Sequence, residues 1–521
     1  MKRDDMLKQA RQRAEPWDII IVGGGATGAG VAVDAATRGY ATLLLEQHDF
    51  GKGTSSRSTK LVHGGVRYLE QGNVSLVMEA LKERGLLRQN APHLVNELAC
   101  IVPSYAWWEG PFYGIGLKVY ELLAGKYGFG KSKKISRKET LQRLPNVNPD
   151  GLTGGVVYYD GQFDDARLLI NLIATAAEHG ASLLNYARVI ALQTGDDGLV
   201  NGVRWQDLET GETFRARAKV VINATGAFTD SVRRLAEPDA RPMIAPSQGA
   251  HLVFDRSFLP GTNAILVPHT KDGRVMFAIP WHGHTLVGTT DTPLTETALE
   301  PVALEAEIEF ILETARLYLE KKPSRSDILS VFAGIRPLVK SNGGANTAAL
   351  SRDHVIHIDK TGLLTITGGK WTTYRNMAQG CVDQAAILAD LPDKPCVTRT
   401  LKIHGHHANA SEFGALSIYG SDAPAIRDLI SQDATLDRQL DSQLRCTEAE
   451  VVWAARMEMA RTVEDVLARR TRAVFLDAKA AIRMAPRVAE ILSRELGRDE
   501  KWQAEQIEAF DKIARGFLAA S

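Results

Sequence analysis

The sequence predicts an α/β protein with three parts: a nucleotide-binding domain, a domain built on an antiparallel sheet, and a helical C-terminal domain. Three observations support this prediction. A strand, a glycine loop, a helix and a second strand are indicated within residues 18–46, short β-rich runs occupy 243–290, and residues 413–519 have helical apolar spacing. A chain of 521 residues is also too long for one ordinary core, which favours two or three domains.

The strongest local signal lies at the start of residues 18–46. The apolar run 18–22 is typical of a buried parallel strand, and Gly23, Gly25 and Gly28 follow it in the pattern G-x-G-x-x-G. In a dinucleotide-binding unit the first glycine permits a tight turn and the second lets the backbone approach a pyrophosphate. The third lets the helix and the strand pack closely.

The elements after these glycines keep the order of a βαβ unit. Residues 26–38 are alanine-rich and helical in composition, so the positive end of a helix would face the phosphates. A second apolar strand, 41–45, ends at Glu46, which is placed to accept hydrogen bonds from ribose hydroxyls. Because all these features occur in register, we predict a nucleotide site rather than a glycine turn in an unrelated α/β domain.

Two later strands also end in small residues. Residues 219–226 and 362–370 each lead from an apolar strand into a glycine turn, so we predict one nucleotide-binding domain assembled from separated segments. Between them, β-rich runs predict an antiparallel sheet, and residues 301–320 predict a helix. The expected boundaries are 16–90, 151–240 and 330–390 for the nucleotide-binding domain, 91–150 and 241–329 for a substrate-binding domain, and 400–521 for the helical C-terminal domain.

Composition narrows the classes of function. Lys plus Arg and Asp plus Glu each number 62, so no overall charge favours nucleic acid, and we expect none as a partner. The four cysteines lie far apart without a C-x-x-C pattern, so we predict neither a disulfide framework nor a metal site. No stretch reaches about 18 uninterrupted apolar residues, and residues 1–15 are not typical of a secretory signal.

Longer motifs resemble one family. Residues 54–70, TSSRSTKLVHGGVRYLE, resemble the signature that follows the βαβ unit in FAD-dependent, respiratory glycerol-3-phosphate dehydrogenases. The segments 249–253, 288–291, 333–338, 351–353 and 368–375 resemble that family in the same order. The resemblance implies FAD as the cofactor. Within the α/β class it implies a FAD-binding Rossmann-like domain of the glutathione-reductase and D-amino-acid-oxidase type.

The same resemblance implies a reaction. Such an enzyme oxidises sn-glycerol 3-phosphate to dihydroxyacetone phosphate by hydride transfer from C2 to flavin N5, and it passes the electrons to a membrane quinone. The insertion found in related glycerol-3-phosphate oxidases is not evident here, which favours a dehydrogenase. The alternatives are an oxidase that uses O2, an amine or amino-acid oxidase of the same fold, and a flavoprotein scaffold or tRNA-modifying binding protein.

A dianionic phosphate is best bound by guanidinium groups and amines. Arg336 and Arg352 lie in the family's motifs and are the expected phosphate ligands, and Arg67 beside Tyr68 is a further candidate at the substrate. Lys370, in a glycine turn, is expected to contact the substrate or the electron-rich edge of the flavin. For any single arginine, a surface ion pair is the alternative.

The reaction also releases one proton. His63 and His251 are the candidate general bases, because imidazole titrates near neutrality, and the sequence does not choose between them. Asp291 is a candidate to orient one of them. With Lys370 and Arg336, the two histidines form the expected catalytic set. The expected cofactor-binding residues are Gly23, Gly25, Thr27, Gly28, Glu46, Thr54, Ser55, Ser56, Thr225, Gly226, Gly368, Gly369, Lys370 and Thr372.

Aromatic residues and lysines are concentrated in residues 105–134. The segment includes Trp107, Trp108 and Phe112, and five lysines lie among its aromatic residues or directly after them. This composition suits the headgroup region of a bilayer, and the alternative is a buried helix of the substrate domain. The resemblance implies a cytoplasmic enzyme bound peripherally to the inner face of the cytoplasmic membrane. Whether the chain forms a homodimer is left open.

Overall fold

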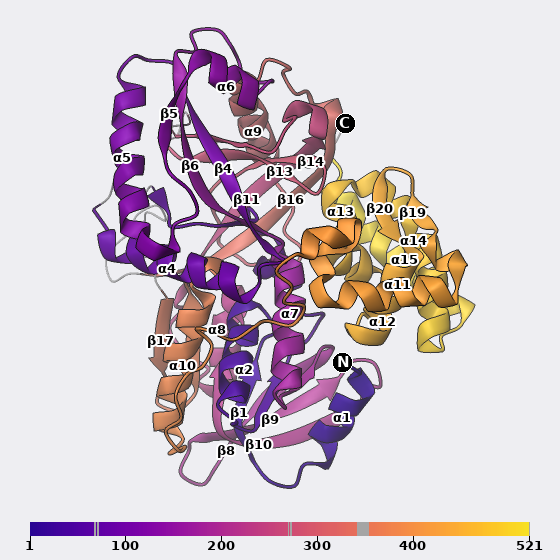
Figure 1. Cartoon of the computed structure of the whole chain (residues 1–521). Helices are drawn as coiled ribbons and strands as arrows, with labels where there is room; N and C mark the ends of the chain where they lie inside the picture. Colours follow the sequence, from indigo (N-terminus) through magenta and orange to yellow (C-terminus); the bar gives the residue numbers. More distant parts are fainter. Residues whose placement is uncertain (67–68, 70–71, 269, 271–272, 341–353, 520–521) are drawn as a thin grey trace.

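Two large sheets and a helical C-terminal region make up the protein (Figure 1). The computed structural model describes residues 1–66, 69, 72–268, 270, 273–340 and 354–519. In Figure 1 one sheet occupies the lower part of the molecule and the other the upper part, and the C-terminal helices, coloured orange to yellow, pack beside both. Among the described residues, no helix combines the length and the apolar character needed to cross a bilayer.

The lower sheet consists mainly of parallel strands. In space the order is β17-β18-β10-β1-β2-β7, and all pairs from β18 to β7 are parallel. The strands of this sheet are β1 (Trp17–Val22), β2 (Thr42–Leu45), β7 (Ser182–Leu184), β8 (Ala187–Thr194), β9 (Val200–Asp207), β10 (Thr213–Asn223), β17 (His354–Ile358) and β18 (Leu364–Gly368).

Both faces of the lower sheet are covered, which explains why its strands are continuous apolar runs. Ile19 and Ile21 of β1 belong to a core shared with the helices α2 (Ala26–Thr37), α7 (Asp165–Glu178) and α10 (Tyr374–Leu388). Ile20 and Val22 belong to a second core on the opposite face, which includes residues of β9, β10 and α1 (Arg3–Gln12). The predicted βαβ unit is therefore present, with its helix at the predicted place.

The upper sheet is mostly antiparallel, as predicted for residues 243–290. In space its order is β15-β11-β14-β13-β12-β4-β6-β3, with β16 paired to β11 and β5 paired to β6. Its strands are β3 (Leu61–Val62), β4 (Val95–Ser104), β5 (Lys133–Ser136), β6 (Gly154–Phe163), β11 (Ile244–Asp255), β12 (Ala264–Val267), β13 (Met276–Trp281), β14 (His284–Gly288), β15 (Thr292–Pro293) and β16 (Ile328–Val339). Around it pack α4 (Val74–Asn90), α5 (Glu109–Ala124), α6 (Arg137–Arg143) and α9 (Glu305–Tyr318), the last within the helix predicted for 301–320.

Three strands correct the predicted boundaries. β3, β6 and most of β16 fall in the ranges 16–90, 151–240 and 330–390 predicted for the nucleotide-binding domain, and all three strands belong to the upper sheet. β6 pairs with β4 from Phe163 to Gly154, and β16 pairs with β11 over nearly its whole length. The correction has a physical reason: pairing with partners distant in the chain decides the sheet, and no local pattern encodes that pairing.

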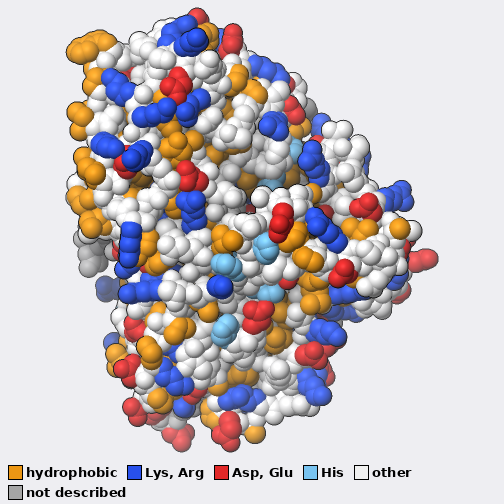
Figure 2. Space-filling view, viewed as in Figure 1, with side chains coloured by type: hydrophobic (Ala, Val, Ile, Leu, Met, Phe, Trp, Pro, Cys, Tyr) orange, Lys and Arg blue, Asp and Glu red, His pale blue; other side chains and the backbone are white. Residues whose placement is uncertain are grey.

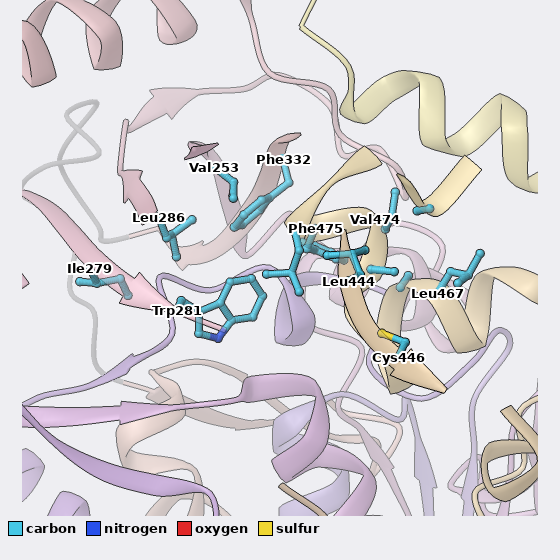
Figure 3. Close-up of a cluster of buried hydrophobic side chains, with 14 of the residues drawn as sticks. Val253, Ile279, Trp281, Leu286, Phe332, Leu444, Cys446, Leu467, Val474 and Phe475 are labelled. Atoms are coloured by element: carbon cyan, nitrogen blue, oxygen red, sulfur yellow. The ribbon is translucent and has the colours of Figure 1, made fainter. Parts of the chain in front are cut away.

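The C-terminal region is helical, as predicted, with one short hairpin that the sequence did not indicate. Its helices share a core with the upper sheet, and Figure 3 shows Phe475 beside Phe332 and Trp281 of that sheet. The elements are α11 (Ala423–Gln432), α12 (Glu448–Met457), a π-helical turn (Asp465–Arg470), α13 (Ala473–Leu476), α14 (Ala478–Leu496), α15 (Glu500–Ala514) and the hairpin β19 (Gln439–Asp441) and β20 (Leu444–Thr447).

Candidate active site

The predicted glycine turns meet at one edge of the parallel sheet. β1, β2, β10 and β18 run in the same direction, so their carboxyl ends lie together. Gly23 follows β1, Glu46 follows β2, Thr225 and Gly226 follow β10, and Gly369 follows β18. Ligands of open α/β sheets bind at this edge. The structure thus brings together residues that the sequence spreads over most of the chain.

The first loop has room only for glycine. Gly23 has a φ of +109°, and a Cβ at Gly28 would lie 1.9 Å from the carbonyl oxygen of Gly23. Gly25 is the N-cap of α2, and Thr27 lies in its first turn. Because free amides and the helix dipole favour anions at such an end, the loop fits a dinucleotide pyrophosphate.

Glu46 lies against this loop. Its carboxylate accepts hydrogen bonds from the amides of Gly24 at 2.7 Å and His48 at 2.8 Å. Burial raises the pKa of Glu46, and the two amide donors oppose that shift. Glu46, which is predicted to contact ribose, is therefore held at the glycine loop by the backbone amides of Gly24 and His48.

The three hydroxyl residues at 54–56 have different surroundings. Ser55 Oγ accepts from the amide of Ala26 at 2.9 Å, which places it at the start of α2. Thr54 Oγ1 donates to the carbonyl of Ile335 at 2.5 Å and lines the cavity described below. Ser56 is buried, and its carbonyl accepts from Lys60. The structure therefore places Thr54 and Ser55 near the expected cofactor position. The carbonyl of Ser56 also accepts from Arg472 of the C-terminal region.

A cavity of about 350 Å³ is lined by residues of both sheets. The predicted residues His63, His251, Arg336, Lys370 and Thr372 all line it, as do Gly368 and Gly369. Arg67, Tyr68 and Arg352 lie outside the described residues, so their roles remain predictions. The cavity brings together the described basic candidates and both histidines.

Arg336 is anchored from three sides. Its guanidinium donates to the carbonyl of Gln248 at 3.2 Å, to Thr289 Oγ1 at 3.2 Å and to the carbonyl of Thr290 at 2.9 Å. The carboxylate of Asp291 lies 3.4 Å away. Asp291 therefore pairs with Arg336, and its role in orienting a histidine stays a prediction. A fixed guanidinium in a cavity wall is suited to bind a phosphate.

The two histidines differ in environment. His251 is buried, its Nε2 lies 2.9 Å from Thr59 Oγ1, and its ring stacks on Phe332 with centroids 4.8 Å apart. Burial lowers the pKa of His251 well below its ordinary value, and the charges of Lys60 and Arg336 lower it further. His63 is half-buried, and its ring meets Phe277 edge-on at 6.4 Å.

The loop that carries His63 is held by a buried polar group. The amide of Gly64 donates to Tyr120 Oη at 2.7 Å, and that hydroxyl donates to Asp160 at 3.0 Å. Asp160 also pairs with Arg84. Asp160 and Tyr113 line the cavity, as do Arg57 and Arg274, and sequence reasoning missed all four of these lining residues. Of these four residues, only Arg57 could have been predicted to lie at the site from the sequence, because it lies inside the motif at 54–70.

The turn after β18 completes the site. Lys370 is the N-cap of the short helix 371–373, and Gly369 before it has a φ of +72°. The indole of Trp371 donates to the carbonyl of Ser55 at 2.9 Å, which joins this turn to the 54–56 segment. This contact holds the Gly368–Gly369 turn and the 54–56 segment together at the carboxyl edge of the sheet, where the residues present fit a FAD molecule.

Comparison with known proteins agrees with this geometry. Residues 18–375 match the family described as FAD dependent oxidoreductase, and residues 360–503 match the C-terminal domain of alpha-glycerophosphate oxidase. The chain is 42% identical to the mitochondrial glycerol-3-phosphate dehydrogenase of Arabidopsis thaliana over 554 residues, which cover 98% of this chain and 88% of that protein. It is 40% identical to the human mitochondrial enzyme over 543 residues, 97% of this chain and 74% of that protein.

A solved structure is similar over the whole chain. It is the glycerol-3-phosphate dehydrogenase of Bacillus halodurans complexed with FAD, with a TM-score of 0.81 and 28% identity, and the match covers 99% of this chain and 98% of that one. The family match and the relatives confirm the predicted FAD-binding fold of the oxidoreductase type. The chain belongs to the FAD-dependent oxidoreductases and, within them, to the glycerol-3-phosphate dehydrogenase family.

Proposed function

We propose that this enzyme oxidises sn-glycerol 3-phosphate to dihydroxyacetone phosphate and passes the electrons to a membrane quinone. One observation carries the proposal: a single cavity holds an anchored arginine, a lysine and two histidines beside the Gly368–Gly369 turn. The substrate must lose a hydride from C2 and a proton from its hydroxyl. When bound, FAD supplies the acceptor for the hydride.

Arg336 is the proposed phosphate ligand. Its anchoring carbonyls and hydroxyl fix the plane of the guanidinium before substrate arrives, so little side-chain entropy is lost on binding. Lys370 supplies a second positive charge on the cavity wall. An amine or amino-acid oxidase would need an arginine for a carboxylate, whereas two cations beside one cavity suit a dianion better.

His251 is the proposed acceptor of the hydroxyl proton, with His63 as the alternative. Burial and the cations Lys60 and Arg336 keep the imidazole of His251 neutral near pH 7, and a neutral imidazole can accept a proton. Thr59 fixes the ring through Nε2. Among the described residues, Nδ1 of His251 is a buried polar atom without a hydrogen-bond partner.

Anaerobic reduction of the bound flavin tests the proposed reaction. Adding sn-glycerol 3-phosphate to the holoenzyme is expected to bleach the flavin absorbance, and glycerol at the same concentration is expected to leave it unchanged, because only the phosphate ester engages the cations. Bleaching by glycine or proline instead would contradict the proposal. Hydrogen peroxide release in air equal to the rate with a quinone would identify an oxidase.

The helix α5 provides the proposed membrane contact. Its inner face is buried and includes Tyr113 and Leu117, which line the cavity. Its outer face exposes apolar side chains at helical spacing. The buried inner face agrees with the alternative of a buried helix, and the exposed outer face supports the proposed membrane contact. Figure 2 shows hydrophobic side chains along the left edge of the molecule, where Figure 1 places α5. The exposed residues are Phe112, Ile115, Val119 and Leu122, with Trp107 and Trp108 just before the helix.

A bilayer is the partner that this surface fits. A continuous apolar stripe marks an interaction surface, whereas single exposed apolar residues are ordinary. Exposed lysines at 118, 126, 131, 133 and 134 lie within or just after α5, and they would attract anionic lipid headgroups. Because the opposite face of the same helix lines the cavity, a quinone in the membrane would be separated from it by about one helix diameter, ~10 Å.

Removing the apolar stripe is expected to release the enzyme from membranes. The double variant Ile115→Ser, Leu122→Ser changes side chains that are 71% and 70% exposed, so the fold should persist. Each apolar side chain contributes ~1.5–3 kcal/mol when buried, so binding to phosphatidylglycerol-containing vesicles should weaken by about tenfold or more. Co-sedimentation measures it, and activity with a soluble dye should remain.

A matched control comes from the lower part of the molecule. Ile387 on α10 is 82% exposed and lies outside the stripe, so Ile387→Ser should co-sediment like the unchanged enzyme. If the double variant also bound vesicles normally, α5 would not be the membrane contact. High salt should weaken binding of the unchanged enzyme only in part, because the apolar contribution is not screened.

A further inference from the structure

We propose that two buried cations, Lys60 from the loop before β3 and Arg472 from the C-terminal region, together with Phe475, are positioning residues for His251. They fix the loop that presents Thr59 to the imidazole and support the ring on which it stacks. The C-terminal region then contributes to the active site without touching the cavity. This inference rests on the proposed role of His251 as proton acceptor.

Lys60 is held in a conformation that needs strong support. It has a φ of +64°, which non-glycine residues rarely adopt, and its side chain is fully buried. Nζ donates to the carbonyl of Ser56 at 2.8 Å and to Asp165 Oδ2 at 2.7 Å. Three aromatic rings, those of Trp281, Phe332 and Phe475, surround it at 5.2 to 5.4 Å. Thr59, its neighbour in the chain, is thereby fixed.

Arg472 reaches the same loop from the C-terminal region. Its guanidinium donates to the carbonyl of Ser56 at 2.7 Å, the acceptor that Lys60 also uses, and to Asp165 Oδ1 at 3.1 Å. Asp165 additionally accepts from the amide of Ser58 at 3.0 Å and from its hydroxyl at 2.7 Å. One buried carboxylate at the start of α7 therefore joins residues 56–60 to Arg472.

The stack on His251 continues into the C-terminal region. The ring of Phe332 lies against His251 on one side, and Phe475 of α13 meets Phe332 edge-on at 4.9 Å (Figure 3). Ser330 Oγ donates to the carbonyl of Val474 at 2.8 Å and fixes α13 against β16. These contacts leave His251 one orientation, with Phe332 behind it and Thr59 at Nε2.

The cluster also sets the charge around His251. Lys60 and Arg336 are the cations that disfavour its protonated form. The charged groups around Lys60 are Asp165, Asp164 and Arg472, and His282 pairs with Asp164. Burial lowers the pKa of Lys60 to about 7, and Asp165 opposes that shift. Lys60 is therefore charged below pH 7, the range in which an imidazole would take up a proton. A positioning role thus predicts an effect on the acid limb of the pH profile.

The test compares Lys60→Met with the unchanged holoenzyme, using kcat for sn-glycerol 3-phosphate with a soluble dye from pH 4 to 9. Loss of the buried charge should raise the pKa of His251, so the variant should lose activity on acidification at a higher pH than the unchanged enzyme does. The matched control is Arg167→Met, because Arg167 is an equally buried cation that pairs with Glu458. Arg167→Met should be less stable than the unchanged enzyme, and the acid limb of its pH profile should not move. An unmoved limb in folded, FAD-loaded Lys60→Met would overturn the proposal.

A second variant decides the matter if Lys60→Met does not fold. Thr59→Val removes the hydrogen bond to His251 and leaves the buried ions intact, so kcat should fall by about tenfold with KM changed less than twofold. A normal kcat would overturn the inference. Failure of the proposed function is seen separately, because the unchanged enzyme would then not be bleached by sn-glycerol 3-phosphate.

Discussion

Arg336→Ala is expected to raise KM for sn-glycerol 3-phosphate by tens-fold or more. Removing one partner of a buried, hydrogen-bonded charge pair costs ~2–5 kcal/mol. The substitution also leaves Asp291, now without its 3.4 Å neighbour, on the wall that receives the phosphate, which adds repulsion. Steady-state kinetics with a soluble dye acceptor measure the change.

Two comparisons separate this effect from unfolding. The flavin content of Arg336→Ala should match that of the unchanged enzyme, because the hydrogen-bond partners of Arg336 described above lie at Gln248, Thr289 and Thr290 and not in the glycine loop. Arg336→Lys keeps the charge and loses the bidentate hydrogen-bonding geometry. Its KM should therefore lie between that of the unchanged enzyme and that of Arg336→Ala. If Arg336→Ala kept a near-normal KM, the phosphate would have to bind elsewhere in the cavity, where Arg57 and Arg274 are the next candidates.

Local signals explain which parts of the fold could be predicted. The βαβ unit was placed correctly because its glycines are required by contacts within the unit, such as the close approach of Gly28 to Gly23. The helix 26–38 and the β-rich runs likewise depend on periodicity. The ranges predicted for the nucleotide-binding domain include β6 and β16, which lie in the upper sheet, because their pairing with β4 and β11 joins segments far apart in the chain.

The candidate site divides in the same way. Arg336, Lys370 and His251 lie in motifs that resemble the family, and they line the cavity as expected. Lys60 lies inside the motif at 54–70, but nothing in the sequence shows that Arg472 and Asp165 meet it in the core. Burial of a charged residue is decided by its partners, and these are visible only in three dimensions.

A second buried charge cluster joins the C-terminal region to the nucleotide-binding sheet. Asp49, just beyond β2, accepts from Arg469 at 2.5 Å and from Arg470 at 2.8 Å, and all three side chains are buried. Arg469 also pairs with Glu464, which in turn pairs with Lys52. Because Asp49 follows Glu46 by three residues, this cluster holds the C-terminal helices beside the cofactor loop.

Asp49→Ala is expected to destabilise the protein by ~3–5 kcal/mol, because it leaves two buried guanidinium groups without their shared carboxylate. Thermal unfolding measures the change. The exposed pair Asp511–Arg515 provides the control, since Asp511→Ala should cost less than about 1 kcal/mol.

The arginines hold the pKa of Asp49 below its ordinary value despite burial. A carboxyl whose pKa is depressed in the folded state stabilises above its unfolded pKa, ~3.9, and loses that contribution as the pH falls. The difference in the free energy of unfolding between the unchanged protein and Asp49→Ala should therefore be largest at pH 7 and shrink below pH 4. Equal stability of Asp49→Ala and Asp511→Ala at pH 7 would show that the buried cluster does not hold the C-terminal region in place.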